Sequence, residues 1–166
     1  LYKDLKLKTN FGVDFNSYSR SYYRPSTLPT SLDRVPPSVP EGSKRDKNML
    51  NWVWENTLSY VKIFKQDHHL SAVAGWSAQK ESANTSLIAG NGYPNDLVHT
   101  INAASAITNW SATAYEWSLL SALARAQYSY KGKYMLSAAV RADGSSRFGK
   151  NNRWGKFPSV SAGRCV

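Results

Sequence analysis

The sequence of 166 residues predicts an all-β protein, an antiparallel up-and-down sheet of about six strands with long loops at one end. Three observations support this prediction. Apolar and polar residues alternate with a period of two along several segments, as in strands with one apolar face. Short and long connections between these segments alternate along the chain, as in bacterial outer-membrane barrels. Aromatic residues gather towards the ends of the segments, which is typical of strands that cross a bilayer.

The first half of the chain is expected to hold three strands. Apolar and polar residues alternate from Leu5 to Asn16, which predicts the first strand. Residues 18–47 are predicted to form a long loop, because they contain Pro25, Pro29, Pro36, Pro37 and Pro40. The alternation returns over Met49–Phe64 and again over Leu70–Gln79, and the turn between them, residues 65–68, is short. These two strands are expected to form a hairpin.

The second half repeats this plan. Residues 81–115 are rich in Gly, Asn, Ser and Thr and are predicted to be irregular, with a short helix within Leu97–Ile107. Three strands are expected after this segment: one over Leu120–Tyr130, one over Tyr134–Asp143 after the tight turn Lys131–Gly132, and one at Phe157–Ser159 beyond a polar loop.

Charge and composition leave several classes open. The chain has 21 Lys and Arg against 11 Asp and Glu, a formal net charge of +10, which favours nucleic acid, acidic glycans or a phosphate-bearing membrane surface as partners. It offers no apolar run of the ~18 residues that a transmembrane helix needs, whereas a transmembrane strand needs only ~9–11 residues with every second one apolar.

No catalytic or metal-binding constellation is visible in the sequence. His68 and His69 are adjacent in a predicted turn, His99 is isolated, and we expect all three to be solvated. Cys165 is the one cysteine and has no partner for a disulfide or a metal site. The sequence therefore predicts neither an enzyme nor a cofactor.

The segment 133–161, KYMLSAAVRADGSSRFGKNNRWGKFPSVS, closely resembles the barrel of the SusC/RagA-like TonB-dependent outer-membrane transporters. The residues that carry the resemblance are Lys133–Tyr134, Arg141, Asp143–Gly149, Asn152–Gly155 and Phe157–Ser159. Segments 54–60, 70–79 and 123–134 are loosely similar to strands of the same family. The last residues, Arg164–Cys165–Val166, depart from the family, which would usually continue there with an aromatic residue.

The resemblance implies that residues 1–166 are part of a large transmembrane barrel, without the plug, a signal peptide or the segment that TonB grips. It further implies import of glycans or peptides across the bacterial outer membrane, with TonB and a SusD-like surface lipoprotein as partners. The outer-membrane lipid and lipopolysaccharide would surround the barrel, and basic residues of the outer loops would attract the lipopolysaccharide phosphates. No nucleic acid is expected.

Parity assigns the two faces of this barrel. Even-numbered side chains of the second to fifth strands are expected to face hydrocarbon, and odd-numbered ones a wet interior. Four residues of the fourth and fifth strands are then predicted to face the lumen and to contact the plug or a ligand: Arg125, Gln127, Arg141 and Asp143. Ion pairs with the plug are the favoured role.

Two further groups of residues are singled out. The loop motif Gly144, Ser145, Ser146, Arg147, Phe148, Gly149 and Trp154 is expected to close on itself by packing, with Arg147 in reach of Asp143; an alternative is that Trp154 or Phe148 stacks on a sugar. Membrane-interface aromatics are predicted in two belts, Tyr60, Tyr128, Tyr130 and Tyr134 near the short turns and Trp52, Trp54, Trp76 and Trp117 near the long loops.

Two other functions fit the residues without the resemblance. A secreted β-rich carbohydrate-binding domain would use the Trp and Tyr rings to bind a glycan from water. A basic nucleic-acid-binding β module would use the positive charge. The strands predicted here, however, carry Ala and Leu on their second face rather than the stacking aromatics that such a module needs.

Overall fold

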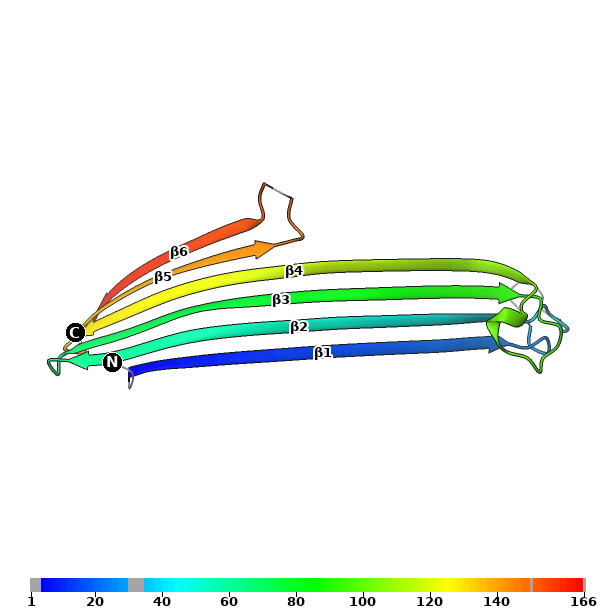
Figure 1. Ribbon diagram of the computed structural model, residues 1–166, viewed down its shortest axis with the longest axis horizontal. Helices are drawn as coiled ribbons and strands as arrows, with labels where there is room; N and C mark the ends of the chain where they lie inside the picture. The colour runs from blue at the N-terminus through cyan, green and yellow to red at the C-terminus, as the bar shows by residue number, and fades with distance from the viewer. Residues whose placement is uncertain (1–3, 30–34, 150, 166) are drawn as a thin grey trace. The chain divides into compact units, whose positions relative to one another are not determined.

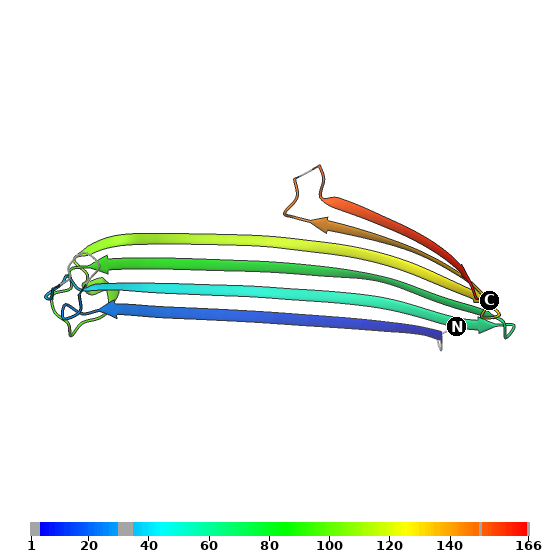
Figure 2. The ribbon, with the colours of Figure 1, turned by 180° about the vertical axis from the view of Figure 1, so that it is seen from behind.

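The computed structural model describes residues 4–29, 35–149 and 151–165. It is all-β, and six strands form one sheet in the order β1-β2-β3-β4-β5-β6 (Figures 1 and 2). Strand order therefore follows chain order, which confirms the predicted up-and-down antiparallel sheet. The strands are β1 (Leu5–Arg24), β2 (Glu41–Phe64), β3 (His68–Asn91), β4 (Ala106–Tyr130), β5 (Tyr134–Ser145) and β6 (Trp154–Arg164).

The first four strands are longer than the sequence predicts. Residues 18–24 and 41–47 were expected to lie in a loop but extend β1 and β2, and residues 81–91 and 106–115 extend β3 and β4 in the same way. These stretches mix polar residues with scattered apolar and aromatic ones, so no regular apolar alternation marks them. Side-chain hydrogen bonds across β1 and β2 add to the backbone ladder, from Ser17 to Asn48 (2.8 Å) and from Ser19 to Asp46 (2.6 Å).

The predicted helix within Leu97–Ile107 is wrong. Only Ile101–Ala103 form a single 3-10 turn, η2, and β4 has already begun at Ala106. Among the described residues, no helix is both long and apolar enough to cross a membrane.

The chain divides into two compact units. The first contains residues 1–14, 51–81 and 117–166, and the second contains residues 15–50 and 82–116. The first unit holds both short turns, residues 65–67 and 131–133. Lys65, Gln66, Lys131 and Gly132 adopt positive φ there, between +51° and +65°, as tight hairpin turns require.

The register of the first unit keeps each face of the sheet continuous. Ala124 of β4 lies opposite Val140 of β5, which lies opposite Pro158 of β6. On the other face Arg125 lies opposite Ala139, and Ala139 opposite Ser159. Even-numbered residues of these strands therefore share one face and odd-numbered residues the other.

No second layer of the described chain covers the sheet. Trp54 is 43% exposed and Val140 is 49% exposed, although both belong to the apolar, even-numbered face. Ala83 and Tyr93 are the only buried apolar residues in the described part of the chain. The sheet thus has two faces of opposite character and no core of its own between layers.

Candidate functional site

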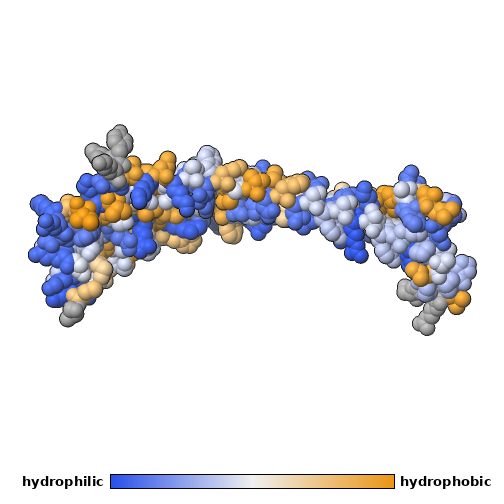
Figure 3. Space-filling model, turned by 90° about the horizontal axis from the view of Figure 1, so that it is seen from below, coloured by the Kyte–Doolittle hydropathy of each residue, from blue (hydrophilic) through white to orange (hydrophobic). Residues whose placement is uncertain are grey.

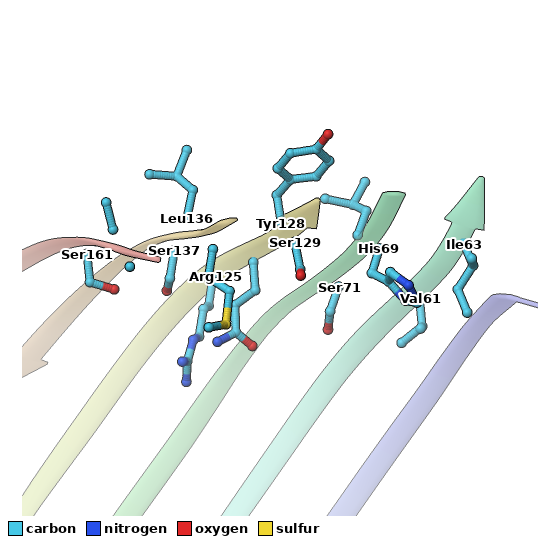
Figure 4. Close-up of a pocket in the computed structure, with 15 residues that line it drawn as sticks. Val61, Ile63, His69, Ser71, Arg125, Tyr128, Ser129, Leu136, Ser137 and Ser161 are labelled. Carbon is cyan, nitrogen blue, oxygen red and sulfur yellow. The ribbon is translucent and has the colours of Figure 1, made fainter. Parts of the chain in front are cut away.

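Arg125 and Gln127 line a hollow of about 500 Å³ on the odd-numbered face, together with Ser71, Ser129, Ser137 and Ser161. Figure 4 shows how the strand alternation builds it: Arg125, Ser71 and Ser129 point to one side of the sheet, and Tyr128 and Leu136 to the other. Arg125 has no ion-pair partner among the described residues. The hollow therefore carries one guanidinium without an ion-pair partner, in a wall that combines hydroxyl and amide groups with apolar side chains such as Val61, Ile63 and Met135.

Arg141 and Asp143, the other two predicted lumen-facing residues, bind each other instead. Arg141 Nε donates to both carboxylate oxygens of Asp143, at 3.0 and 2.8 Å. Arg141 also lines a separate hollow of about 260 Å³ on the same face, with Lys8 and Glu55. The four residues thus share a face, but only Arg125 and Gln127 come together at one hollow.

The loop between β5 and β6 is closed by its own backbone. Ser145 N donates to Arg153 O (3.0 Å), and Ser146 N donates to Ser118 O of β4 (2.9 Å). Ser118 N donates in turn to Ser146 Oγ (2.8 Å). These bonds hold the motif against the sheet.

The side chains of this motif pack on both faces of the sheet. The Trp154 ring covers Gly144, where an added Cβ would lie 2.8 Å from the ring. Arg147 does not pair with Asp143, which Arg141 occupies; its guanidinium lies over the Trp117 ring, 4.5 Å from the centroid. Phe148 remains exposed at 62%. The loop is thus held by its backbone and by the Trp154 and Arg147 contacts, while the Phe148 and Trp154 rings both keep more than half of their surface exposed.

The even-numbered face carries the aromatic residues near the short turns. Phe64 stacks on His68 (5.3 Å between centroids), and Tyr130 lies 4.9 Å from the same ring. His68 Nδ1 is 2.6 Å from Tyr128 Oη. His68 was predicted to be a solvated turn residue, and it is instead held among aromatic rings, because its parity matches theirs. Tyr60 and Tyr134 have the same parity.

The sequence predicted tryptophans near the long-loop ends of the strands, but the structure places them further from those ends. Trp54 and Trp76, which meet edge to face at 4.8 Å, are interior residues of β2 and β3 because these strands extend further than expected. Trp52 lies 6.5 Å from Phe11, and Trp54 Nε1 donates to Thr9 Oγ1 (3.1 Å). Trp54 and Phe64 are the two ends of the stretch 54–64 in β2. The length of this stretch is close to the ~9–11 residues of a transmembrane strand.

Trp117 does not share a face with Trp52, Trp54 and Trp76, the other tryptophans predicted to lie near the long loops. It has odd parity, and Arg147 covers it from the same face of the sheet. Figure 3 shows the resulting surface, with apolar residues gathered along the strands between more polar stretches.

The second unit contains a polar and aromatic cluster that the sequence did not reveal. Asp96 accepts hydrogen bonds from Ser26 Oγ (2.6 Å), Ser26 N (2.9 Å) and Tyr23 Oη (2.9 Å). His99 stacks on Tyr23 at 4.1 Å, and its Nε2 is 2.8 Å from Asp96 O. Tyr93 meets Tyr23 edge to face at 5.0 Å.

The electrostatics of this cluster follow from these contacts. The hydrogen bonds from Ser26 hold the pKa of Asp96 below its ordinary value. Desolvation, followed by the Asp96 carboxylate, raises the pKa of Tyr23 to about 12. A hollow of about 500 Å³ lies beside the cluster, lined by Ser21, Ser43, Lys44, Tyr93, His99, Thr100, Ile101 and Asn102. No sequence motif marks these residues, which come from three separate segments.

Metal chemistry has no geometric support in the described ranges, where no three His, Cys, Asp or Glu side chains come together.

No family model matches the chain. Among curated proteins it is 30% identical over 164 residues to the TonB-dependent receptor P39 of Formosa agariphila, an alignment that covers 96% of this chain and 15% of that protein. It is 45% identical over 53 residues to the TonB-dependent receptor SusC of Bacteroides thetaiotaomicron, covering 32% of this chain and 5% of that protein.

Solved structures give the same result. The structure of the RagAB peptide transporter matches with a TM-score of 0.86 and 25% identity, over 96% of this chain and 18% of that chain. The RagAB peptide importer in its open-open state matches with a TM-score of 0.84. The chain thus spans less than a fifth of each of these relatives. Sequence and fold together place it in the SusC/RagA-like family of TonB-linked outer-membrane transporters, as a segment of the β-barrel.

Proposed function

We propose that this chain forms a stretch of barrel wall in an outer-membrane transporter that imports glycans or peptides, with TonB and a SusD-like surface lipoprotein as partners. We propose further that residues 1–166 are all barrel, with the plug supplied from outside this stretch. The relatives support this assignment: they are TonB-dependent receptors, one is SusC, and RagAB is a peptide transporter.

The observation that carries the proposal is the division of one sheet into two faces. Leu58, Ala74, Ala126 and Val160 line a groove on the even-numbered face of the sheet, and all four side chains are exposed. A soluble protein would have to cover such a face, since burial of apolar surface is the main driving force of folding. In a bilayer the hydrocarbon covers it, while the odd-numbered face lines the aqueous lumen.

The lumen-facing residues divide into two roles under this proposal. Arg141 and Asp143 neutralise each other and stiffen the wall. Arg125 and Gln127 remain available at the hollow of Figure 4 and would contact an acidic group of the plug or of the passing solute. Placing Arg125 on the lipid face instead would cost about 2–4 kcal/mol near the bilayer midplane.

The secreted carbohydrate-binding alternative and the nucleic-acid alternative leave the apolar face unexplained. The even-numbered rings near the short turns, including Tyr128 and Tyr130, pack around His68. We propose that Tyr60, Tyr128, Tyr130 and Tyr134 mark the inner interface, and Trp52, Trp54 and Trp76 the outer one.

Adjacent residues of β5 test which face meets lipid. In the complete transporter, freed of its native cysteines, Val140→Cys and Ala139→Cys variants are labelled with one fluorophore and reconstituted with brominated lipid. We expect strong quenching of the label at position 140 and weak quenching at 139. Equal quenching at both positions would contradict the proposed faces, and quenching by soluble sugar without lipid would favour the carbohydrate-binding domain.

A further inference from the structure

The hollow beside Tyr23 and His99 in the second unit has no assigned role, and most of the side chains that line it are polar or basic. Ser21, Ser43 and Thr100 contribute hydroxyl groups, Asn102 an amide, and Lys44 and His99 basic nitrogens. No acidic side chain is among the described residues that line it. Sugars are bound by such sets of hydrogen-bonding groups beside an aromatic ring, and phosphate groups by cations.

The site is held in shape before any ligand binds. Asp96 fixes its loop to Tyr23 of β1 and, through both donors of Ser26, to the segment that follows β1. His99 is fixed by stacking on Tyr23 and by the contact of its Nε2 with Asp96 O, which leaves its Nδ1 free for a ligand. A preorganised site loses little conformational entropy on binding.

One polar group at the hollow lacks a partner. Tyr93 is only 6% exposed, and its Oη makes no hydrogen bond within the described part of the chain. It rests over Gly42, where even a Cβ would collide with the hydroxyl. With almost no exposed surface of its own, this hydroxyl closes the wall of the hollow beside Gly42.

Within the second unit, the face of β1 and β2 that carries the hollow changes from apolar to polar side chains along the strands. The hydrogen bonds Ser17–Asn48 and Ser19–Asp46 show that odd-numbered residues of β1 and even-numbered residues of β2 share this face. Phe15 and Leu50 begin it and are exposed, whereas Ser21 and Lys44 end it at the hollow. An apolar-to-polar change on a barrel's outer face follows the edge of the hydrocarbon layer, so the hollow lies beyond that edge, at the level of sugars rather than of acyl chains.

We propose that this hollow binds a phosphorylated sugar of lipopolysaccharide in the outer leaflet around the barrel. Lys44 and His99 would bind the phosphate, and Ser21, Thr100 and Asn102 the sugar hydroxyls. Lys44 is free to do so because its contact with Asp46 is long, 3.8 Å, and half of its side chain is exposed. The inference rests on the proposed outer-membrane location and adds a specific lipid site to it.

The test uses the complete transporter in nanodiscs that contain purified lipopolysaccharide, with the bound lipopolysaccharide counted by native mass spectrometry. We expect Lys44→Gln and Asn102→Ala each to lower the retained lipopolysaccharide at least about threefold, and the double variant further. Arg45→Gln is the matched control, since it removes the same charge from the neighbouring, exposed residue on the opposite face.

Three outcomes decide the proposal. Loss in the Lys44→Gln and Asn102→Ala variants but not in Arg45→Gln supports it, and inorganic phosphate at millimolar concentration should then compete only weakly, because it lacks the sugar contacts. Equal losses in the Lys44→Gln and Arg45→Gln variants would overturn it in favour of diffuse attraction. Unchanged retention in all variants would also overturn it. The quenching of labels at positions 139 and 140 tests the proposed membrane location separately, so failure of one proposal is distinguishable from failure of the other.

Discussion

At the residue scale, Gly144 sets how closely Trp154 approaches the sheet. The two residues are directly opposite in the β5–β6 register, and the indole ring occupies the space that a side chain at 144 would need. The glycine of the sequence motif is thus explained by packing rather than by an unusual backbone angle.

Replacement of Gly144 by Ala should destabilise this packing. The added Cβ would lie 2.8–2.9 Å from three atoms of the Trp154 ring, and such overpacking costs about 1–3 kcal/mol. Gly149→Ala is the control, because nothing lies within 4 Å of a Cβ there. Urea unfolding of the transporter in detergent should show a lower midpoint for Gly144→Ala alone; equal midpoints for the two variants would refute the packing role of Gly144.

Asp96 organises the loop of residues 92–105, and its effect should depend on pH. Because hydrogen bonds to the carboxylate lower its pKa in the folded state, its stabilisation is complete above the ordinary pKa of 3.8 and is lost as pH falls through the lowered value. Hydrogen exchange of this loop, corrected for its intrinsic pH dependence, should be slow at pH 7 and faster at pH 2. In Asp96→Ala it should be fast at both; protection at pH 7 in that variant would contradict this role.

At the element scale, β5 presents two environments through neighbouring residues. Ala138 lies between Ala126 and Val160 on the apolar face, and Ser137 lies between Gln127 and Ser161 on the polar face. Strand alternation alone separates the two positions.

Arginine at these two positions should have very different costs. Ala138→Arg would place a charge in the hydrocarbon and should destabilise the folded barrel by about 2–4 kcal/mol, depending on depth. Ser137→Arg would face the aqueous hollow and should change stability little. Folding titrations of the transporter in phospholipid vesicles compare the two, and a cost at 137 equal to that at 138 would be inconsistent with the assigned faces.

At the scale of the whole molecule, the sheet leaves both its outer strands and its apolar face uncovered. β1 and β6 each have one neighbour in the sheet, so each presents a row of unpaired backbone groups. Exposed edges and a continuous apolar face promote association in water.

The isolated 166-residue chain should therefore aggregate in water and become dispersed in detergent. Light scattering after size-exclusion chromatography measures this directly, with the same sample in detergent as the control. A monodisperse, cooperatively unfolding product in plain buffer would show that the chain has some other way to cover its apolar face.

The sequence was sufficient where one physical signal dominates. Alternation identified the first five strands and assigned Arg125 and Gln127 to the polar face, because strand geometry sends successive side chains to opposite sides. The segment Asp143–Gly149 also indicated the correct family, because the backbone and packing requirements of this loop are specific. Sequence alone therefore determined the fold class, the family and the parity of the faces.

Only the tertiary structure decided the strand lengths and the partners. Residues 41–47 and 106–115 are in strands because backbone ladders hold them, and side-chain hydrogen bonds between β1 and β2 add to the ladder at Asp46. Such interactions leave no hydropathy pattern. The placing of His68 among rings and the joining of Tyr23, Asp96 and His99 depend on residues distant in sequence. Asp143 pairs with nearby Arg141 rather than with Arg147, whose guanidinium lies over the distant Trp117 ring. A periodic signal reports which way a side chain points, whereas the group that it meets is set by register and loop closure.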